Sequence, residues 1–81
     1  MSESGQDEMT TPDQLRAARA ILGLSQSDVA SLTGKTTKTI RRAETEAGAV
    51  AENTIASIRA ALESAGVEFI PENGGGAGVR L

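Results

Sequence analysis

The fold of this chain is decided by the stretch from residue 24 to residue 44, which reads Leu-Ser-Gln-Ser-Asp-Val-Ala-Ser-Leu-Thr-Gly-Lys-Thr-Thr-Lys-Thr-Ile-Arg-Arg-Ala-Glu. Ser25 and Thr36 are good N-cap residues, and each precedes a segment whose apolar residues have helical spacing. Gly34 lies between the two segments and suits the left-handed end of a helix. The stretch therefore predicts two short helices joined by a tight turn.

Half of the chain's positive charges lie at the second of these helices. They fall within eight residues that no acidic residue interrupts, and they are Lys35, Lys38, Arg41 and Arg42. On a helical wheel Ile40 and Ala43 share one face, and the cations within the helix lie on the opposite face. This layout is typical of a helix-turn-helix, a motif whose second helix enters a groove of DNA.

One further helix is predicted on each side of this pair. Thr11 and Gln14 form a capping box before the first helix, which ends at Gly23. The last helix runs from about residue 52 to residue 65 and ends at Gly66. The residues expected to face the core from the four helices are Leu15, Ala18, Leu22, Val29, Leu32, Ile40, Ala43, Ile55, Ile58 and Leu62.

The sequence period changes near the C-terminus. Residues 67–70 are typical of a short strand, residues 71–78 of a turn-rich break and residues 79–81 of a second strand. The predicted fold class is therefore mainly α, a bundle of four helices followed by a short C-terminal β-hairpin. A hairpin is barely stable alone, so we expect it to pair with a second copy across a two-fold axis. The residues assigned to this dimer contact are Val67, Phe69, Ile70, Val79 and Leu81.

The composition limits what the chain can do. Its 81 residues, 38% of them hydrophobic and one of them aromatic, have room for one small core. The chain contains no cysteine or histidine, which removes disulfides, most zinc sites and the commonest general base. We therefore expect no metal, no cofactor and no enzymatic activity, and a partner subunit as the support of a thin core.

Charge is distributed unevenly along the chain. The net charge is −3, but residues 1–13 hold four acids and no cation, which leaves 8 cations and 7 acids, or +1, for the rest. We expect residues 1–10 to form a disordered acidic tail and residues 11–66 a DNA-binding domain. No segment approaches the roughly 20 apolar residues of a membrane span, and the N-terminus has no signal pattern. A cytoplasmic location is expected.

The spacing of residues over positions 12–65 resembles that of the phage Cro and lambda-repressor family, also called the XRE family, of helix-turn-helix regulators. The matching residues are Leu15, Arg19, Gly23, Leu24, Ser25, Gln26, Val29, Ala30, Gly34, Thr36, Ile40 and Glu44. The chain departs from the family at Lys35, where an apolar residue is usual, and at Ala43, where a larger one is common. Its C-terminal hairpin also replaces an additional helix, which bears on the dimer geometry.

The resemblance implies a role in DNA binding for the residues around the turn. Those that match base-contacting positions are Thr37, Lys38 and Arg42. Those assigned to phosphate contacts are Gln26, Lys35, Thr36, Thr39 and Arg41. Arg19 and Glu44 match an ion pair that ties the first helix to the end of the third. These residue types suit the work, since lysine or arginine can donate to guanine and a threonine methyl can touch thymine.

The chain is therefore predicted to be a sequence-specific transcriptional regulator, a dimeric repressor that binds a pseudo-palindromic site in double-stranded DNA. Two copies would place two reading helices one DNA turn apart, roughly 34–36 Å. The alternative hypothesis is a protein-binding module on the same scaffold, such as an antitoxin or an anti-activator. A nucleotide-binding P-loop ending at residues 34–36 is rejected, because position 29 is valine where that motif requires glycine.

Overall fold

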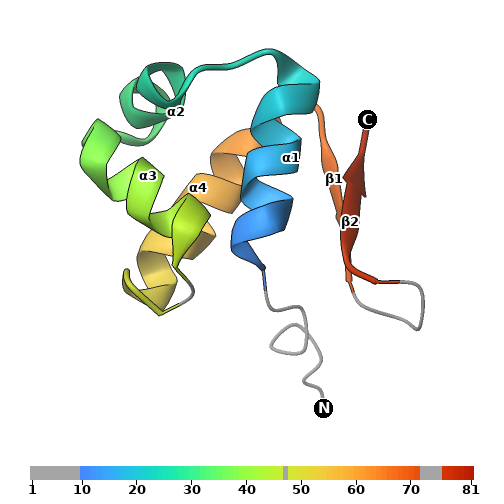
Figure 1. The fold of residues 1–81 in the computed structure, drawn as a ribbon. Coiled ribbons are helices and arrows are strands. Elements are labelled where there is room, and N and C mark those ends of the chain that lie inside the picture. The colour runs from blue at the N-terminus through green and yellow to red at the C-terminus, as the bar shows by residue number, and fades with distance from the viewer. Residues whose placement is uncertain (1–9, 47, 72–75) are drawn as a thin grey trace.

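The computed structural model describes residues 10–46, 48–71 and 76–81. Its helices are α1 (Pro12–Leu22), α2 (Gln26–Thr33), α3 (Thr37–Thr45) and α4 (Glu52–Ser64), and its strands are β1 (Glu68–Ile70) and β2 (Gly78–Arg80). This part of the chain is mainly helical with one small antiparallel sheet, as predicted (Figure 1). The expected acidic tail lies outside the described residues, apart from Thr10. No described helix is long and apolar enough to cross a membrane.

The turns that flank α2 are built from local bonds, which explains why the sequence predicts them. Ser25 and Asp28 form a reciprocal capping box in which each side chain accepts from the other residue's backbone N–H. Gly23 ends α1 at φ 71° and Gly34 ends α2 at φ 69°, a left-handed conformation that glycine adopts without strain. The angle at which the chain enters and leaves α2 is therefore fixed within a few residues of each turn.

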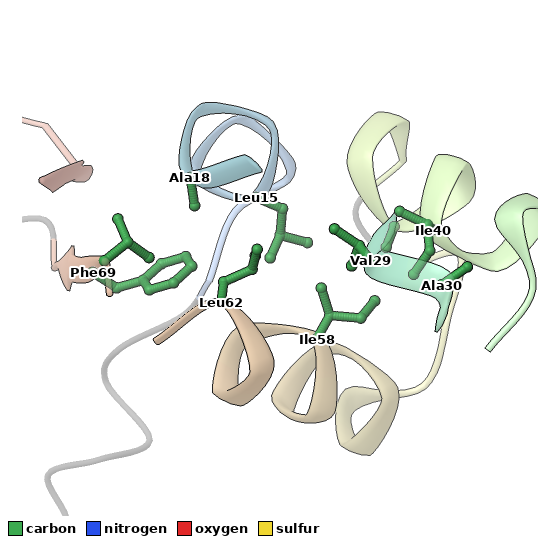
Figure 2. Packing of buried hydrophobic residues seen from close by; sticks show 10 residues of the cluster. Leu15, Ala18, Val29, Ala30, Ile40, Ile58, Leu62 and Phe69 are labelled. Carbon is green, nitrogen blue, oxygen red and sulfur yellow. The ribbon is translucent and has the colours of Figure 1, made fainter. Parts of the chain in front are cut away.

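The core lies between the four helices and extends to β1 (Figure 2). Its largest fully buried side chains are Leu15, Val29, Ile40, Ile58 and Leu62. Val67 and Phe69 belong to the same cluster, and the Phe69 ring points toward Leu62 of α4. The sheet therefore completes the core of the helices and is not an appended element.

Leu32 does not enter the core, and the prediction that it would was wrong. Its side chain is 58% exposed. The buried side of α2 is set by Val29 and Ala30, with Thr33 between them on the helical wheel. At 3.6 residues per turn, Leu32 lies about 110° from the middle of that arc. An eight-residue helix can bury one narrow arc only, so Leu32 faces water.

Gln14 joins α1 to both strands. Its Nε2 donates to the carbonyl oxygens of Ile70 and Gly78, at 3.0 Å in each case, and its Oε1 accepts from the Thr11 backbone N–H at 2.9 Å. Gln14 is 4% exposed, so water does not compete for these bonds. The capping role of Gln14 was predicted, whereas its contact with the strands was not.

The sheet pairs Phe69 of β1 with Val79 of β2 in an antiparallel register. Val67 and Phe69 are only 4% and 5% exposed in the single chain. Both are therefore core residues, which corrects the expectation that they contact a second copy. The physical reason is that strand side chains alternate, and this chain's own helices cover the inner face of the sheet. Of the remaining expected contacts, Leu81 is exposed and Ile70 and Val79 are partly exposed.

Candidate nucleic-acid interface

α3 packs one face on the core and leaves the other in water. Ile40 and Ala43 are 0% and 2% exposed, and the backbone N–H of Thr39 donates to the Thr36 hydroxyl at 3.2 Å to cap the helix. The exposed residues of the outer face are Thr37, Lys38, Arg41, Arg42 and Thr45. All three residues predicted to read bases therefore share this face. In Figure 1, α3 lies across α1 from the sheet.

The chain's cations divide into two groups. Four of them form ion pairs with a carboxylate, and these are Arg16 with Asp13, Arg19 with Glu44, Arg59 with Glu63 and Arg80 with Glu68. The other four make no side-chain ion pair or hydrogen bond within the described residues, and these are Lys35, Lys38, Arg41 and Arg42. Every unpaired cation thus belongs to α3 or to the turn before it.

Glu44, near the C-terminal end of α3, is the residue around which the polar contacts on the buried side of that helix gather. Its residue is 2% exposed, and its carboxylate accepts from Arg19 Nε at 2.7 Å and from Arg19 Nη2 at 3.1 Å. The third nitrogen of that guanidinium, Nη1, donates to the Leu24 carbonyl oxygen at 3.1 Å. The implied Arg19–Glu44 ion pair is therefore present, and it joins α1, the turn before α2 and the end of α3.

Two contacts with Glu44 were missed by the sequence analysis. Gln26 Nε2 donates to Glu44 Oε1 at 3.1 Å, although the resemblance assigned Gln26 to phosphate alone. Arg16 Nη1 donates to the backbone carbonyl of Glu44, near the end of α3. No local sequence signal announces either bond, because the partners lie 18 and 28 residues apart. Both depend on how the helices cross.

The start of α2 lies beside Glu44. The Ser25 hydroxyl caps the Asp28 N–H at 2.9 Å, and the backbone N–H groups of Gln26 and Ser27 have no hydrogen-bond partner among the described residues. Hydrogen bonds with Ser25 lower the pKa of the Asp28 carboxyl. The bond with the Ser25 backbone has the larger effect and the bond with its side chain the smaller one. Lys35 is partly buried in the turn after α2.

The chain matches no protein-family model, and it matches no curated protein. The family resemblance therefore rests on the residue pattern of positions 12–65 alone. The described residues contain no group of three or more acidic, histidine or cysteine side chains that could hold a metal ion.

Proposed function

We propose that this chain is a sequence-specific DNA-binding regulator of transcription with a lambda-repressor-like fold. The observation that supports the proposal is that the four unpaired cations of the described residues lie on or beside the exposed face of α3. A phosphate backbone attracts such cations by releasing its counterions. Because α3 is a helix with a free polar face, it has the shape that enters the major groove.

The side chains of the proposed interface have two different tasks. Thr37, Lys38 and Arg42 contact base edges. The phosphate contacts come from the rim of the same face and from the start of α2, and they are Gln26, Lys35, Thr36, Thr39 and Arg41. The hydroxyls of Thr36 and Thr39 also bond each other at 3.0 Å, so these two residues hold the cap as well as the backbone of DNA.

We further propose that the chain acts as a homodimeric repressor in the cytoplasm. The structure leaves Leu81 78% exposed at the end of β2, and strands this short gain stability by pairing with another strand. Leu81→Asp should raise the concentration at which dimers form, as measured by analytical ultracentrifugation. Deleting the whole hairpin is a poorer test, because it removes Phe69 from the core.

DNA binding is tested by titrating the full chain against a labelled duplex that the wild type selects from a random library. Arg42→Ala should weaken binding by ~1–3 kcal/mol and relax base preference at one position. Arg80→Ala removes the same charge from an ion pair on the sheet, so it serves as the control once its dimerisation has been checked. Equal effects of both variants would show that net charge, and not α3, governs binding.

The alternative function, a protein-binding module such as an antitoxin or an anti-activator, has one observation in its favour. Leu32 is a large apolar residue that α2 exposes to water. Counterion release predicts that DNA affinity falls steeply between about 50 and 200 mM salt. A flat salt response, together with loss of a protein partner on Leu32→Ser, would favour this alternative.

A further inference from the structure

Gln26 lies at the start of α2, yet its side chain contacts the end of α3. The amide Nε2 donates to Glu44 Oε1 at 3.1 Å, and that same oxygen accepts from Arg19 Nη2 at 3.1 Å. Gln26 itself is partly exposed, whereas Glu44 is 2% exposed. Gln26 is therefore the side chain that connects α2 to the buried carboxylate beneath α3.

The remaining contacts of Glu44 come from α1. Arg19 donates two bonds to the carboxylate, and Arg16 donates to the backbone carbonyl of the same residue. These arginines tie α3 to α1, and Arg19 also reaches the Leu24 carbonyl in the turn before α2, but neither contacts α2 itself. Among the described polar contacts of Glu44, the Gln26 amide alone comes from α2, and it adds to the packing of Val29 and Ala30 in the same core as Ile40.

The angle between α2 and α3 matters because α3 carries its exposed side chains at a distance from the pivot. Glu44 lies near the C-terminal end of α3, and Lys38 lies nearly two turns before it. A small rotation of α3 about Glu44 would therefore move Lys38 and Thr37 relative to α2 and to the DNA groove that both helices face. Hydrogen bonds to base edges tolerate little displacement.

We propose that Gln26 is a positioning residue that sets base discrimination by α3 through its bond to Glu44. This inference rests on the proposed function. It gives Gln26 a second task beside the phosphate contact that the family resemblance implies. A residue that holds a phosphate affects all DNA sequences alike, whereas a residue that orients α3 affects the preferred sequence most.

The experiment compares full-length wild type with Gln26→Met, which keeps the length of the side chain and removes its donor. Each protein is titrated against the library-selected duplex and against a scrambled duplex of equal composition. The ratio of the two dissociation constants should fall threefold to tenfold, about the net effect of one typical hydrogen bond, because Gln26 is partly exposed. Ser27→Ala is the control, because it alters the neighbouring exposed residue and leaves the Gln26 amide in place.

Two further measurements identify the route. In the free protein, Gln26→Met should shift the amide NMR signals of α3, whereas Ser27→Ala should leave them in place. In a Glu44→Leu background, Gln26→Met should change the ratio by less than twofold, because position 44 then offers no side-chain acceptor for the Gln26 amide. Rescue by Gln26→Asn is not expected, since its shorter side chain falls short of Oε1.

The outcomes separate this inference from the proposed function. Equal weakening on both duplexes would show that Gln26 holds phosphate only, and unmoved α3 signals would show that it orients nothing. Either result overturns the inference while DNA binding stands. A wild-type chain that prefers no duplex refutes the proposed function, and base discrimination by Gln26 with it.

Discussion

The Arg19–Glu44 pair should respond very differently to the loss of each partner. The two side chains are 23% and 3% exposed, so Arg19 can reach water and Glu44 cannot. Arg19→Met leaves a sealed carboxylate with the Gln26 amide as its one remaining side-chain donor among the described residues. Glu44→Leu instead leaves a guanidinium that keeps its bond to the Leu24 carbonyl and gains solvent.

The magnitudes follow from this asymmetry. An uncompensated buried charge costs about 3–5 kcal/mol, so we expect Arg19→Met to lower the free energy of unfolding by about that amount. A domain of this length has a total stability of roughly 4–12 kcal/mol, so this variant loses much of it. Glu44→Leu should cost less, about 1–3 kcal/mol, because the orphaned group is partly hydrated. The double variant buries no charge and should be more stable than Arg19→Met alone.

Urea unfolding followed by helical circular dichroism measures these differences, since the chain has no tryptophan or tyrosine for fluorescence. The double-mutant cycle also gives the coupling between the two side chains. The reasoning is refuted if Glu44→Leu destabilises as much as Arg19→Met. It is refuted equally if the double variant shows the sum of the single losses.

The remaining predictions concern the sheet, the Ser25–Asp28 cap at the start of α2 and the cations of α3. Gln14→Leu should cost roughly 2–4 kcal/mol, because two strand carbonyls lose their donor, and hydrogen exchange should show faster opening of β1 and β2. The lowered pKa of Asp28 means that its carboxylate stabilises the fold above its unfolded pKa of about 4 and that this contribution is lost as pH falls through the folded pKa. Asp28→Asn should therefore flatten the melting temperature against pH in acid, and an unchanged acid profile would contradict this. Lys38→Ala removes the repulsion between Lys38 and the arginines three and four residues later in α3. The free energy of unfolding measured in urea should therefore rise by about 0.2–0.5 kcal/mol, while DNA affinity falls.

The sequence predicts those parts of the structure that depend on neighbours in the chain. The caps at Ser25 and Thr36 and the turn at Gly34 are local, and the structure confirms all of them. Leu32 was assigned to the core because it is apolar, but the arc that α2 buries depends on where α3 and α4 cross it. The burial of Phe69 was missed for the same reason, since it depends on how β1 returns to α4.

The candidate site shows the same limit. Its exposed face could be predicted, because Lys38 and Arg42 lie opposite Ile40 on any α-helix. Its support could be predicted in part, through the family resemblance that implies the Arg19–Glu44 pair. The bond from Gln26 to Glu44 could not, because it requires the relative placement of two helices that no periodicity encodes.

The division of the cations connects stability to the proposed binding. Two of the four ion pairs join separate elements, Arg19 linking α1 to α3 and Arg80 linking β2 to β1, and the other two lie within α1 and within α4. The unpaired cations join nothing among the described residues, so their field is directed outward even though the net charge of the chain is −3. A polyanion that meets α3 would displace water and counterions and break no ion pair of the fold.

Substitutions of the paired arginines should therefore change mainly the free energy of unfolding, and substitutions of the unpaired cations should change mainly the affinity for DNA. A cation of α3 whose loss unfolds the chain without altering affinity per folded molecule would count against α3 as the interface.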